Sequence, residues 1–588
     1  MTDAAGAKGV RWDLTPLAPS EQAMKERLDA AVADATAFVE SRPVDAIAAI
    51  EPPDLADVLR ELAALRAARR EAGQWALVLQ WSDGENPAVA DISAWVYEHL
   101  PRLDEAIRHF ELAWMAIPDD RAEALAGDEM VSADRHYLLS VRRFTPFMLT
   151  PGEERALSAR EASASTAWKA LRDRALGSLV TRFDDGTGER EWTLSELEEA
   201  RRSNPDREVR RDATAATKEL VRPALPVLAQ CYDAIVADRL SVDRLRGHDD
   251  PMAARNLENE IDGCVVEELL AAAQAHVETG RRWFTTKARL LGLERLDTID
   301  LSAPAIEAAP LLWDEGRRLT LEVFDSLSTV LGVEAERFFT GQRVDAEMRR
   351  GKPYGAFCIW PSTRVPGFAL VNWSGQLGNL VALVHELGHG THYALAAAAQ
   401  SDNSFEPGLA VAEIPSTFAE LWLVDHLLEV DPELGRAALA QELDQMVLVA
   451  FNATALARYE QAAYAARAAG QALTPERLDE LCGAEFAKVE ADAVSDEQGL
   501  RPTTWALMPH FVHERFYTYA YVFALLVAAG LVSRAREPGF ADRYEQFLAR
   551  GGSGSPDELL AILGVDLAGP DIWNDGFATI DRWIDGVE

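Results

Sequence analysis

Apolar and polar positions follow a helical pattern along most of the chain. Long stretches are dominated by Ala, Leu, Arg and Glu, which favour helix, and they have the character of amphipathic helices. The pattern predicts helices over residues 20–40, 54–72, 87–117, 152–180, 206–246, 264–292 and 310–332, and again over 376–399, 410–430, 433–468, 475–488 and 515–533. Turns are predicted at Pro52-Pro53, Pro118-Asp119-Asp120 and Asp184-Asp185-Gly186. The chain is therefore expected to be mostly α-helical.

One region, between Arg343 and Trp373, breaks the helical pattern. Glycines and prolines punctuate it at positions 351, 353, 355, 361, 366 and 367, with short apolar runs between them. This predicts two or three short strands joined by turns, and so a small β-sheet directly before the helix at 376–399. An edge strand of such a sheet can pair with the backbone of an extended peptide without reading its side chains.

The composition narrows the class of protein. With 588 residues, of which 48% are hydrophobic and 26% charged, the chain has an ordinary soluble composition. Its formal net charge of -38 repels nucleic acid and anionic membranes, so neither is an expected partner.

The location of the protein is expected to be cytoplasmic. The most apolar run, residues 521–532, is shorter than the roughly 20 residues that span a bilayer, and the first residues lack a signal-peptide pattern. The cysteines at positions 231, 264, 358 and 482 lie far apart and form no CxxC pair, which fits reduced thiols in a cytoplasm.

A metal-binding pattern stands inside the helix at 376–399, in the sequence His385-Glu386-Leu387-Gly388-His389. Two histidines four positions apart leave the same face of a helix, about 6 Å apart along its axis, which suits two ligands of one tetrahedral ion. Glu386 lies beside them but points differently, so it can hold a water and act as a base. The surrounding leucines and valines indicate a buried helix, in which histidines need partners. The motif therefore predicts one Zn²⁺ per chain.

A third ligand must come from elsewhere, because position 395 is Leu and the longer pattern HExxHxxGxxH is excluded. The next predicted helix carries Glu413 and Glu420, seven positions apart and hence on one face. Either can ligate while the other orients a histidine, and Asp425 and His426 are weaker candidates. A solvated glutamate is the ordinary alternative for each. His392 is not counted as a ligand.

Polar aromatic residues gather before the apolar helix at 515–533. Tyr517 and Tyr521 are four apart and share a face, and His510 precedes them. Their hydroxyls and imidazole can donate to a developing oxyanion. They can equally pack in a core with the hydroxyls satisfied locally. The residues alone leave both interpretations open.

Taken together, these motifs resemble the thimet oligopeptidase and oligoendopeptidase F family of zinc metallopeptidases. The resemblance rests on HELGHGTH followed by AEIPSTFAE, on GAFC upstream, and on the segment from Met508 to Tyr521. The opening Trp12-Asp13-Leu14 and the closing FLARGG also look like oligoendopeptidase F. The likeness therefore covers nearly the whole chain.

This resemblance implies a fold and a set of site residues. It implies a mostly α protein, with two helical lobes flanking a deep substrate channel and a small β-sheet next to the HExxH helix. It implies an N-terminal helical region over 1–120, an oligopeptidase F-type helical subdomain over 121–200 and a catalytic domain over 201–588. It also implies Glu413 as the third zinc ligand, and His510 and Tyr517, with Tyr521 next, as residues that bind the substrate or transition state.

The expected function is zinc-dependent hydrolysis of short oligopeptides, with Glu386 as general base. Two other classes stay open. One is a non-catalytic peptide-binding protein of the same fold, although mere binding does not need Glu386. The other is a zinc hydrolase of non-peptide amides.

Overall fold

A computed structural model of the protein describes residues 6–587. Its contacts group the chain into two compact units, each assembled from three segments. Unit 1 consists of Met1–Pro146, Ala308–Gly435 and Leu531–Leu567, and unit 2 of Phe147–Glu307, Arg436–Gly530 and Ala568–Glu588. The predicted boundaries after residues 120 and 200 divide the chain into consecutive regions instead, and they stay a prediction.

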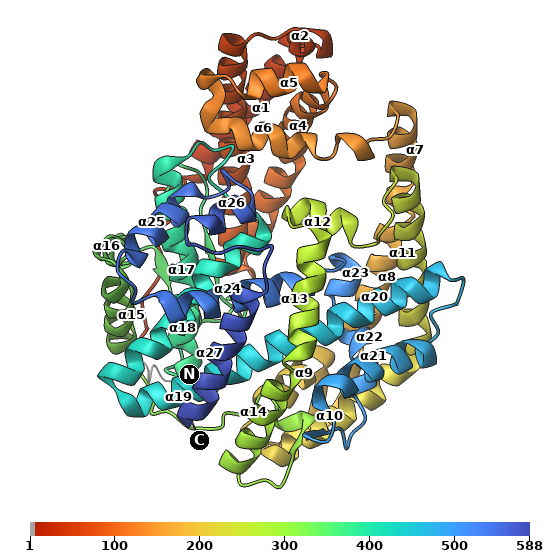
Figure 1. The fold of residues 1–588 in the computed structure, drawn as a ribbon, viewed down its shortest axis with the longest axis vertical. Coiled ribbons are helices and arrows are strands. Elements are labelled where there is room, and N and C mark those ends of the chain that lie inside the picture. Colours follow the sequence, from red (N-terminus) through yellow and green to blue (C-terminus); the bar gives the residue numbers. More distant parts are fainter. Residues whose placement is uncertain (1–5, 588) are drawn as a thin grey trace. The chain divides into compact units, whose positions relative to one another are not determined.

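Unit 1 is built from helices and one small sheet (Figure 1). Its first segment forms α1 (Glu21–Ser41), α2 (Val44–Ala48), α3 (Pro52–Asp83), α4 (Pro87–Met115), α5 (Asp119–Ala126) and α6 (Arg135–Arg142). The later segments form α15 (Trp313–Leu327), α16 (Thr329–Thr340), α17 (Leu377–Ala399), α18 (Leu409–Val430), α25 (Phe540–Arg550) and α26 (Pro556–Ala561). The mostly α prediction is confirmed.

Prolines in unit 1 begin helices rather than separate them. Pro52 is the first residue of α3, where its missing N–H costs no hydrogen bond, so the predicted turn at Pro52-Pro53 is wrong. Pro118 likewise precedes α5 directly, and Asp119 already belongs to that helix. Acidic residues in a first helical turn are favoured by the helix dipole, which explains why Asp119 and Asp120 do not form a turn.

Unit 2 is also helical (Figure 1). It contains α7 (Pro151–Glu161), α8 (Ser165–Gly177), α9 (Leu194–Ser203), α10 (Arg207–Val221), α11 (Leu225–Arg246), α12 (Ala253–Asn259), α13 (Gly263–Ala275), α14 (Val277–Leu290), α20 (Thr454–Ala468), α21 (Pro475–Glu490), α22 (Thr504–Leu507), α23 (His510–His513) and α27 (Asp571–Val587). Two helices cross the unit boundaries: α19 (Pro432–Val447) and α24 (Thr518–Arg534).

An antiparallel hairpin in unit 2 was not predicted. Strands β1 (Val180–Asp184) and β2 (Glu189–Thr193) pair around the turn that the sequence did predict at Asp184-Asp185-Gly186. Gly186 has φ +93, a conformation that glycine adopts without strain, and its N–H donates to Asp184 Oδ1 at 2.9 Å. Two-residue strands β3 (Leu296–Asp297) and β7 (Val494–Ser495) form a second, parallel pair.

Several predicted long helices are interrupted. The stretch 310–332 breaks at Ser328, whose hydroxyl accepts hydrogen bonds from Val330 N and Leu331 N and so caps α16. The stretch 206–246 passes through a 3₁₀ turn at Arg222–Ala224, where Pro223 lacks the N–H that an α-helix needs. The stretch 433–468 passes through a π-helical turn, η5 (Leu448–Ala453).

One helical stretch, residues 207–246, is long and apolar enough by length and composition alone to cross a membrane. Buried helices of soluble proteins meet the same criterion. Here Arg210 within the stretch is buried and hydrogen-bonded to the backbone oxygen of Ile299, as in a protein core.

The small sheet in unit 1 confirms the short strands predicted between residues 343 and 373. Strand β6 (Phe368–Leu370) lies in the middle, parallel to β4 (Val344–Asp345) and antiparallel to β5 (Phe357–Ile359). The sheet packs against α17 through β5 and β6. Strand β5 therefore lies at an edge of the sheet and next to the helix that carries the HExxH motif.

Candidate metal centre

The backbones of helices α17 and α18 lie close together where they meet, because the residue of α17 at that point is a glycine. A Cβ built on Gly388 would lie 2.6 Å from Ser416 Cα and 2.8 Å from the Pro415 carbonyl oxygen. Any side chain at position 388 would push the two helices apart. The glycine between the two motif histidines is thus what allows the glutamates of α18 to reach the histidines of α17.

Three predicted ligands come together at this contact. The ligand atoms of His385, His389 and Glu413 all lie within 4.8 Å of one another. Glu413 Oε2 is 3.6 Å from His385 Nε2 and 3.4 Å from His389 Nε2. Donors held at about 2.0–2.2 Å from a tetrahedral ion lie roughly 3.4 Å apart, so this group fits one zinc ion. We call these three residues the metal cluster.

Glu420 lies beside the metal cluster but not in it. Its Oε1 is 2.8 Å from His385 Nδ1, so it holds the ring with Nε2 facing Glu413. This carboxylate–histidine pair is the usual support of a metal-ligating imidazole. The structure therefore separates the two glutamates that the spacing left open: Glu413 joins the cluster and Glu420 orients a histidine.

The weaker candidates lie elsewhere. Asp425 pairs with Arg536 at 2.6 Å, and His426 Nε2 is 4.0 Å from Glu322. Neither belongs to the group that could hold a metal among the described residues. Ser416, which the sequence reasoning missed, donates its hydroxyl to Glu413 Oε2 at 3.2 Å. Its position three residues after Glu413, one helical turn on, is the signal that could have found it.

The charges of the site perturb its titrating groups strongly. Burial lowers the pKa of His385, but the carboxylates of Glu420, Glu386 and Glu413 outweigh it and raise that pKa to about 10. Burial raises the pKa of Glu413, while hydrogen bonding to His389 and the charges of both histidines bring it down to about 2. Glu413 thus stays an anion, as a metal ligand must.

The predicted base is buried next to the cluster. Glu386 is 7% exposed, and burial raises the pKa of its carboxyl although His385 and His389 oppose the effect. A carboxylate whose pKa is moved upward toward neutrality can take and return a proton during a reaction. Position, burial and pKa direction all suit the role that the motif predicts.

Two other residues near the motif are not ligands. His392 is buried, stacks on Tyr393 and Phe547, and burial followed by the charge of His389 lowers its pKa to about 3, so it is a neutral packed ring. Cys358 lies half-buried in β5, where burial raises the pKa of its thiol. A protonated thiol is a poor nucleophile.

The predicted oxyanion residues form a cluster of their own in unit 2. His510, Tyr517 and Tyr521 have ring centroids 5.0–6.0 Å apart, and Tyr521 Oη lies 3.4 Å from His510 Nε2. We call them the tyrosine cluster. Tyr519 is fully buried and its hydroxyl accepts from Asn259 Nδ2 at 2.8 Å, so it is a packed ring.

The turn before the tyrosine cluster is held by a buried glutamate. Phe516 has φ +51, and its N–H donates to Glu460 Oε2 at 2.8 Å. His513 Nε2 lies 3.1 Å from Asp173 Oδ2. The role of the tyrosine cluster in catalysis stays a prediction.

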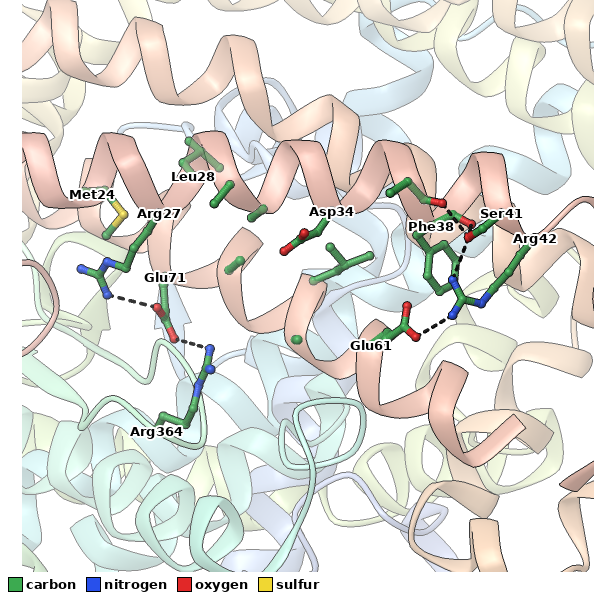
Figure 2. A pocket seen from close by; sticks show the side chains of 16 residues that line it. Met24, Arg27, Leu28, Asp34, Phe38, Ser41, Arg42, Glu61, Glu71 and Arg364 are labelled. Atoms are coloured by element: carbon green, nitrogen blue, oxygen red, sulfur yellow. Dashed lines mark hydrogen bonds and ion pairs between the residues drawn. The ribbon is translucent and has the colours of Figure 1, made fainter. Parts of the chain in front are cut away.

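A groove of about 710 Å³ runs between α1 and α3 in unit 1 (Figure 2). Glu71 lies between Arg27 and Arg364, at 3.5 and 3.4 Å, and Arg42 pairs with Glu61 at 2.5 Å. The residues that line the groove include no histidine or cysteine. Glu61 and Glu71 are each paired with arginines that also line the groove, and no lining residue belongs to the metal cluster.

Comparisons with known proteins point to one class. Residues 319–579, which include the metal cluster and the tyrosine cluster, match the model of peptidase family M3. The chain is 27% identical over 382 residues to the group B oligopeptidase PepB of Streptococcus agalactiae, covering 64% of this chain and 63% of that protein. It is 27% identical over 350 residues to an oligoendopeptidase F homolog of Lactococcus lactis, covering 59% and 58%. The similarity thus spans somewhat under two thirds of these relatives.

The fold also matches a solved structure. Oligoendopeptidase F from Enterococcus faecium superimposes with a TM-score of 0.69 over 95% of this chain and 96% of that one, at 19% identity. At this identity the likeness shows the fold alone. It confirms the mostly α architecture expected from the sequence.

Proposed function

We propose that the protein is a zinc-dependent endopeptidase that hydrolyses short oligopeptides, because residues 319–579 match the model of peptidase family M3. The observation that carries the proposal is the metal cluster of His385, His389 and Glu413 on two helices in backbone contact. A binding protein needs no buried glutamate beside such a cluster. The presence of Glu386 there favours hydrolysis.

The metal cluster would hold one zinc ion through the Nε2 atoms of the two histidines and a carboxylate oxygen of Glu413. When bound, zinc supplies a Lewis acid that polarises a carbonyl and makes a water more acidic. Glu420 keeps the His385 ring in place through its 2.8 Å contact with Nδ1. Ser416 does the same for Glu413 by donating to its carboxylate.

Glu386 acts as the general base and then as the acid. Its carboxylate takes a proton from the attacking water and returns it to the leaving amine. Burial supports this cycle, because it raises the pKa of Glu386 and so lowers the free energy of its protonated state between the two transfers.

Two further elements are proposed to bind the substrate. Among the described residues strand β5 pairs with β6 alone, and an extended peptide can add to its other edge by backbone hydrogen bonds. His510, Tyr517 and Tyr521 are proposed as donors to the developing oxyanion. Removal of one such donor typically costs about 100-fold or more in turnover.

The cytoplasmic location remains part of the proposal. All four cysteines are free, including Cys231 and Cys482, which are buried. Free thiols are stable in a reducing compartment.

Product mapping tests the proposed function. The purified protein is incubated with a mixed pool of short peptides, and the products are identified by mass spectrometry. We expect internal cleavage that a chelator abolishes and that added zinc restores. Peptides that bind but are never cut would instead indicate a peptide-binding protein, and cleavage of simple amides but not peptides would indicate a different hydrolase.

A further inference from the structure

Tyr393 lies on the same face of α17 as the two motif histidines. His385, His389 and Tyr393 follow one another at intervals of four, about one helical turn each, so their side chains leave one face of the helix. The rings of His389 and Tyr393 are neighbours, with centroids 6.3 Å apart and planes inclined by 23°. Tyr393 is therefore the next side chain along this face after the metal cluster.

The hydroxyl of Tyr393 is available to a ligand. Tyr393 is half-buried, and its hydroxyl makes no hydrogen bond within the described residues. Since it is not one of the fully enclosed unpaired atoms of those residues, it keeps accessible surface. A buried tyrosine usually finds a partner for its hydroxyl, as Tyr519 does with Asn259. An accessible, unpaired phenol can instead donate to a substrate or accept from it.

The loop after α17 brings a carboxylate to this hydroxyl. Phe405 is fully buried and meets the Tyr393 ring edge-on, with centroids 6.4 Å apart and planes at 68°. The next residue is Glu406, whose side chain is 51% exposed. Burial first, and then the charges of Glu406 and Cys358, raise the pKa of Tyr393. The phenol thus has Glu406 beside it, and strand β5, which carries Cys358, borders the same place.

Glu406 keeps its negative charge although an arginine lies near it. Arg70 Nη2 donates to Asp402 Oδ1 at 2.7 Å, whereas Arg70 Nη1 is 3.7 Å from Glu406 Oε2, too far for a hydrogen bond. One arginine therefore faces two carboxylates, and one carboxylate charge is left uncompensated. Asp402 is buried, so the carboxylate that a ligand can reach is Glu406.

The loop that carries Glu406 is held in place from two sides. Gly552 N donates to the Ser404 carbonyl at 2.8 Å, and a Cβ built on Gly552 would lie 2.2 Å from the Glu406 carbonyl oxygen. The motif FLARGG, to which the proposed function gives no role, thus packs backbone against backbone on this loop. On the other side, Asn403 Nδ2 donates to the Leu59 carbonyl at 3.0 Å. A pinned loop presents its carboxylate at little cost in conformational entropy.

We propose that Tyr393 and Glu406 form a subsite that selects a basic side chain, lysine or arginine, in the substrate. The cation pairs with Glu406 and donates to the hydroxyl oxygen of Tyr393. Tyr393 lies about 6 Å along the helix from His389, and an extended peptide advances about 3.3 Å per residue. The selected side chain therefore lies within two residues of the scissile bond. This specificity rests on the proposed function.

The net charge of the chain offers a different source of preference for cations. A formal charge of -38 attracts cationic peptides as a whole. That attraction is nearly the same wherever the peptide carries its charge, and salt screens it. A subsite instead acts at one position of the peptide. The position dependence of the preference therefore distinguishes the two sources.

Peptide profiling with the purified zinc-loaded protein tests the subsite. A peptide with one mapped cleavage site receives lysine, norleucine or glutamate, in turn, at the two residues on either side of the scissile bond. Norleucine keeps the length of the lysine chain without its charge. At one of these positions we expect kcat/KM for lysine to exceed that for norleucine about tenfold, and glutamate to be the poorest, because a hydrogen-bonded cation is gained.

The outcomes separate this proposal from the proposed function. Cleavage with equal kcat/KM for lysine and norleucine at every position would overturn the subsite alone. A preference for lysine of the same size at all positions would assign it to the net charge and also overturn the subsite. Absence of cleavage of every peptide would refute the proposed function, and the subsite with it.

Variants then locate the preference. Glu406→Gln should lower the ratio of lysine to norleucine about tenfold, and Tyr393→Phe several-fold. Glu406→Lys should reverse the order of the lysine and glutamate peptides, which a purely structural role would not do. Tyr393→Phe removes only an unbonded hydroxyl, so it keeps the test valid if a Glu406 variant fails to fold.

Two exposed residues of unit 1 supply matched controls. Glu40→Gln on α1 and Tyr97→Phe on α4 make the same chemical changes and should leave the ratio within about twofold. Zinc content and unfolding temperature are measured for every variant. Unchanged ratios in Tyr393→Phe and Glu406→Gln, at wild-type zinc content and unfolding temperature, would refute the assignment.

Discussion

Gly388→Ala should damage the metal cluster without touching any of its ligands. The added Cβ would lie 2.6 Å from Ser416 Cα, which is about 0.9 Å short of an ordinary carbon contact near 3.5 Å. The contact is with backbone, so no side chain can rotate away and α18 must move. Overpacking of this kind costs roughly 1–3 kcal/mol of folding free energy. A shift of Glu413 by several tenths of an ångström should also weaken zinc binding, by about 10–100-fold if it resembles loss of a supporting contact.

Zinc affinity measured by competition with a chromogenic chelator, together with thermal unfolding, checks this prediction. Gly73→Ala is the matched control, because Gly73 lies inside α3 of the same unit and its Cβ would meet only Leu100 Cδ1, at 3.5 Å. That change should raise stability by about 0.5–1 kcal/mol and leave zinc affinity unchanged. Wild-type zinc affinity and unfolding temperature in Gly388→Ala would refute the claim that backbone contact between α17 and α18 builds the site.

Two further variants test the surroundings of the two clusters. Glu420→Gln should lower zinc affinity about 10–100-fold, because His385 loses its carboxylate partner. The control Glu433→Gln, at an exposed position on α19, should leave zinc affinity unchanged. Equal zinc affinities in the two variants would show that Glu420 does not orient His385. Burial raises the pKa of Glu460 from 4.5 to about 8, so its protonated form stabilises the fold fully below about pH 4.5, and this contribution is lost as the pH rises through about 8. Glu460→Gln mimics the protonated acid, so unfolding free energies measured between pH 5 and 9 should fall for the wild type relative to the variant, by a few kcal/mol in all. A difference independent of pH would show that Glu460 titrates normally.

Helices with local start and stop signals were predictable from the sequence. The stretch predicted at 87–117 is observed at Pro87–Met115, where Asn86 caps the helix and Pro87 occupies its first position. The stretch predicted at 376–399 is observed at Leu377–Ala399. Breaks inside long apolar patterns were not predictable, because Ser328 reads as an ordinary helix residue until its hydroxyl is seen to cap α16.

The candidate site is likewise predictable from the sequence in part. His385, Glu386 and His389 belong to one helix, so their spacing alone places them together. Glu413 and Glu420 come from a second helix, and only the contact at Gly388 decides which one faces the histidines.

The central claim is that Glu386 performs chemistry beside a zinc ion that other residues hold. Glu386→Gln removes the base and keeps the shape of the side chain, so elemental analysis should still find one zinc per chain. Peptide cleavage by the same preparation should be lost, by a factor of at least about 100, the lower end of what positioned acid–base catalysis contributes. Full zinc content with cleavage near the wild-type rate would contradict the account.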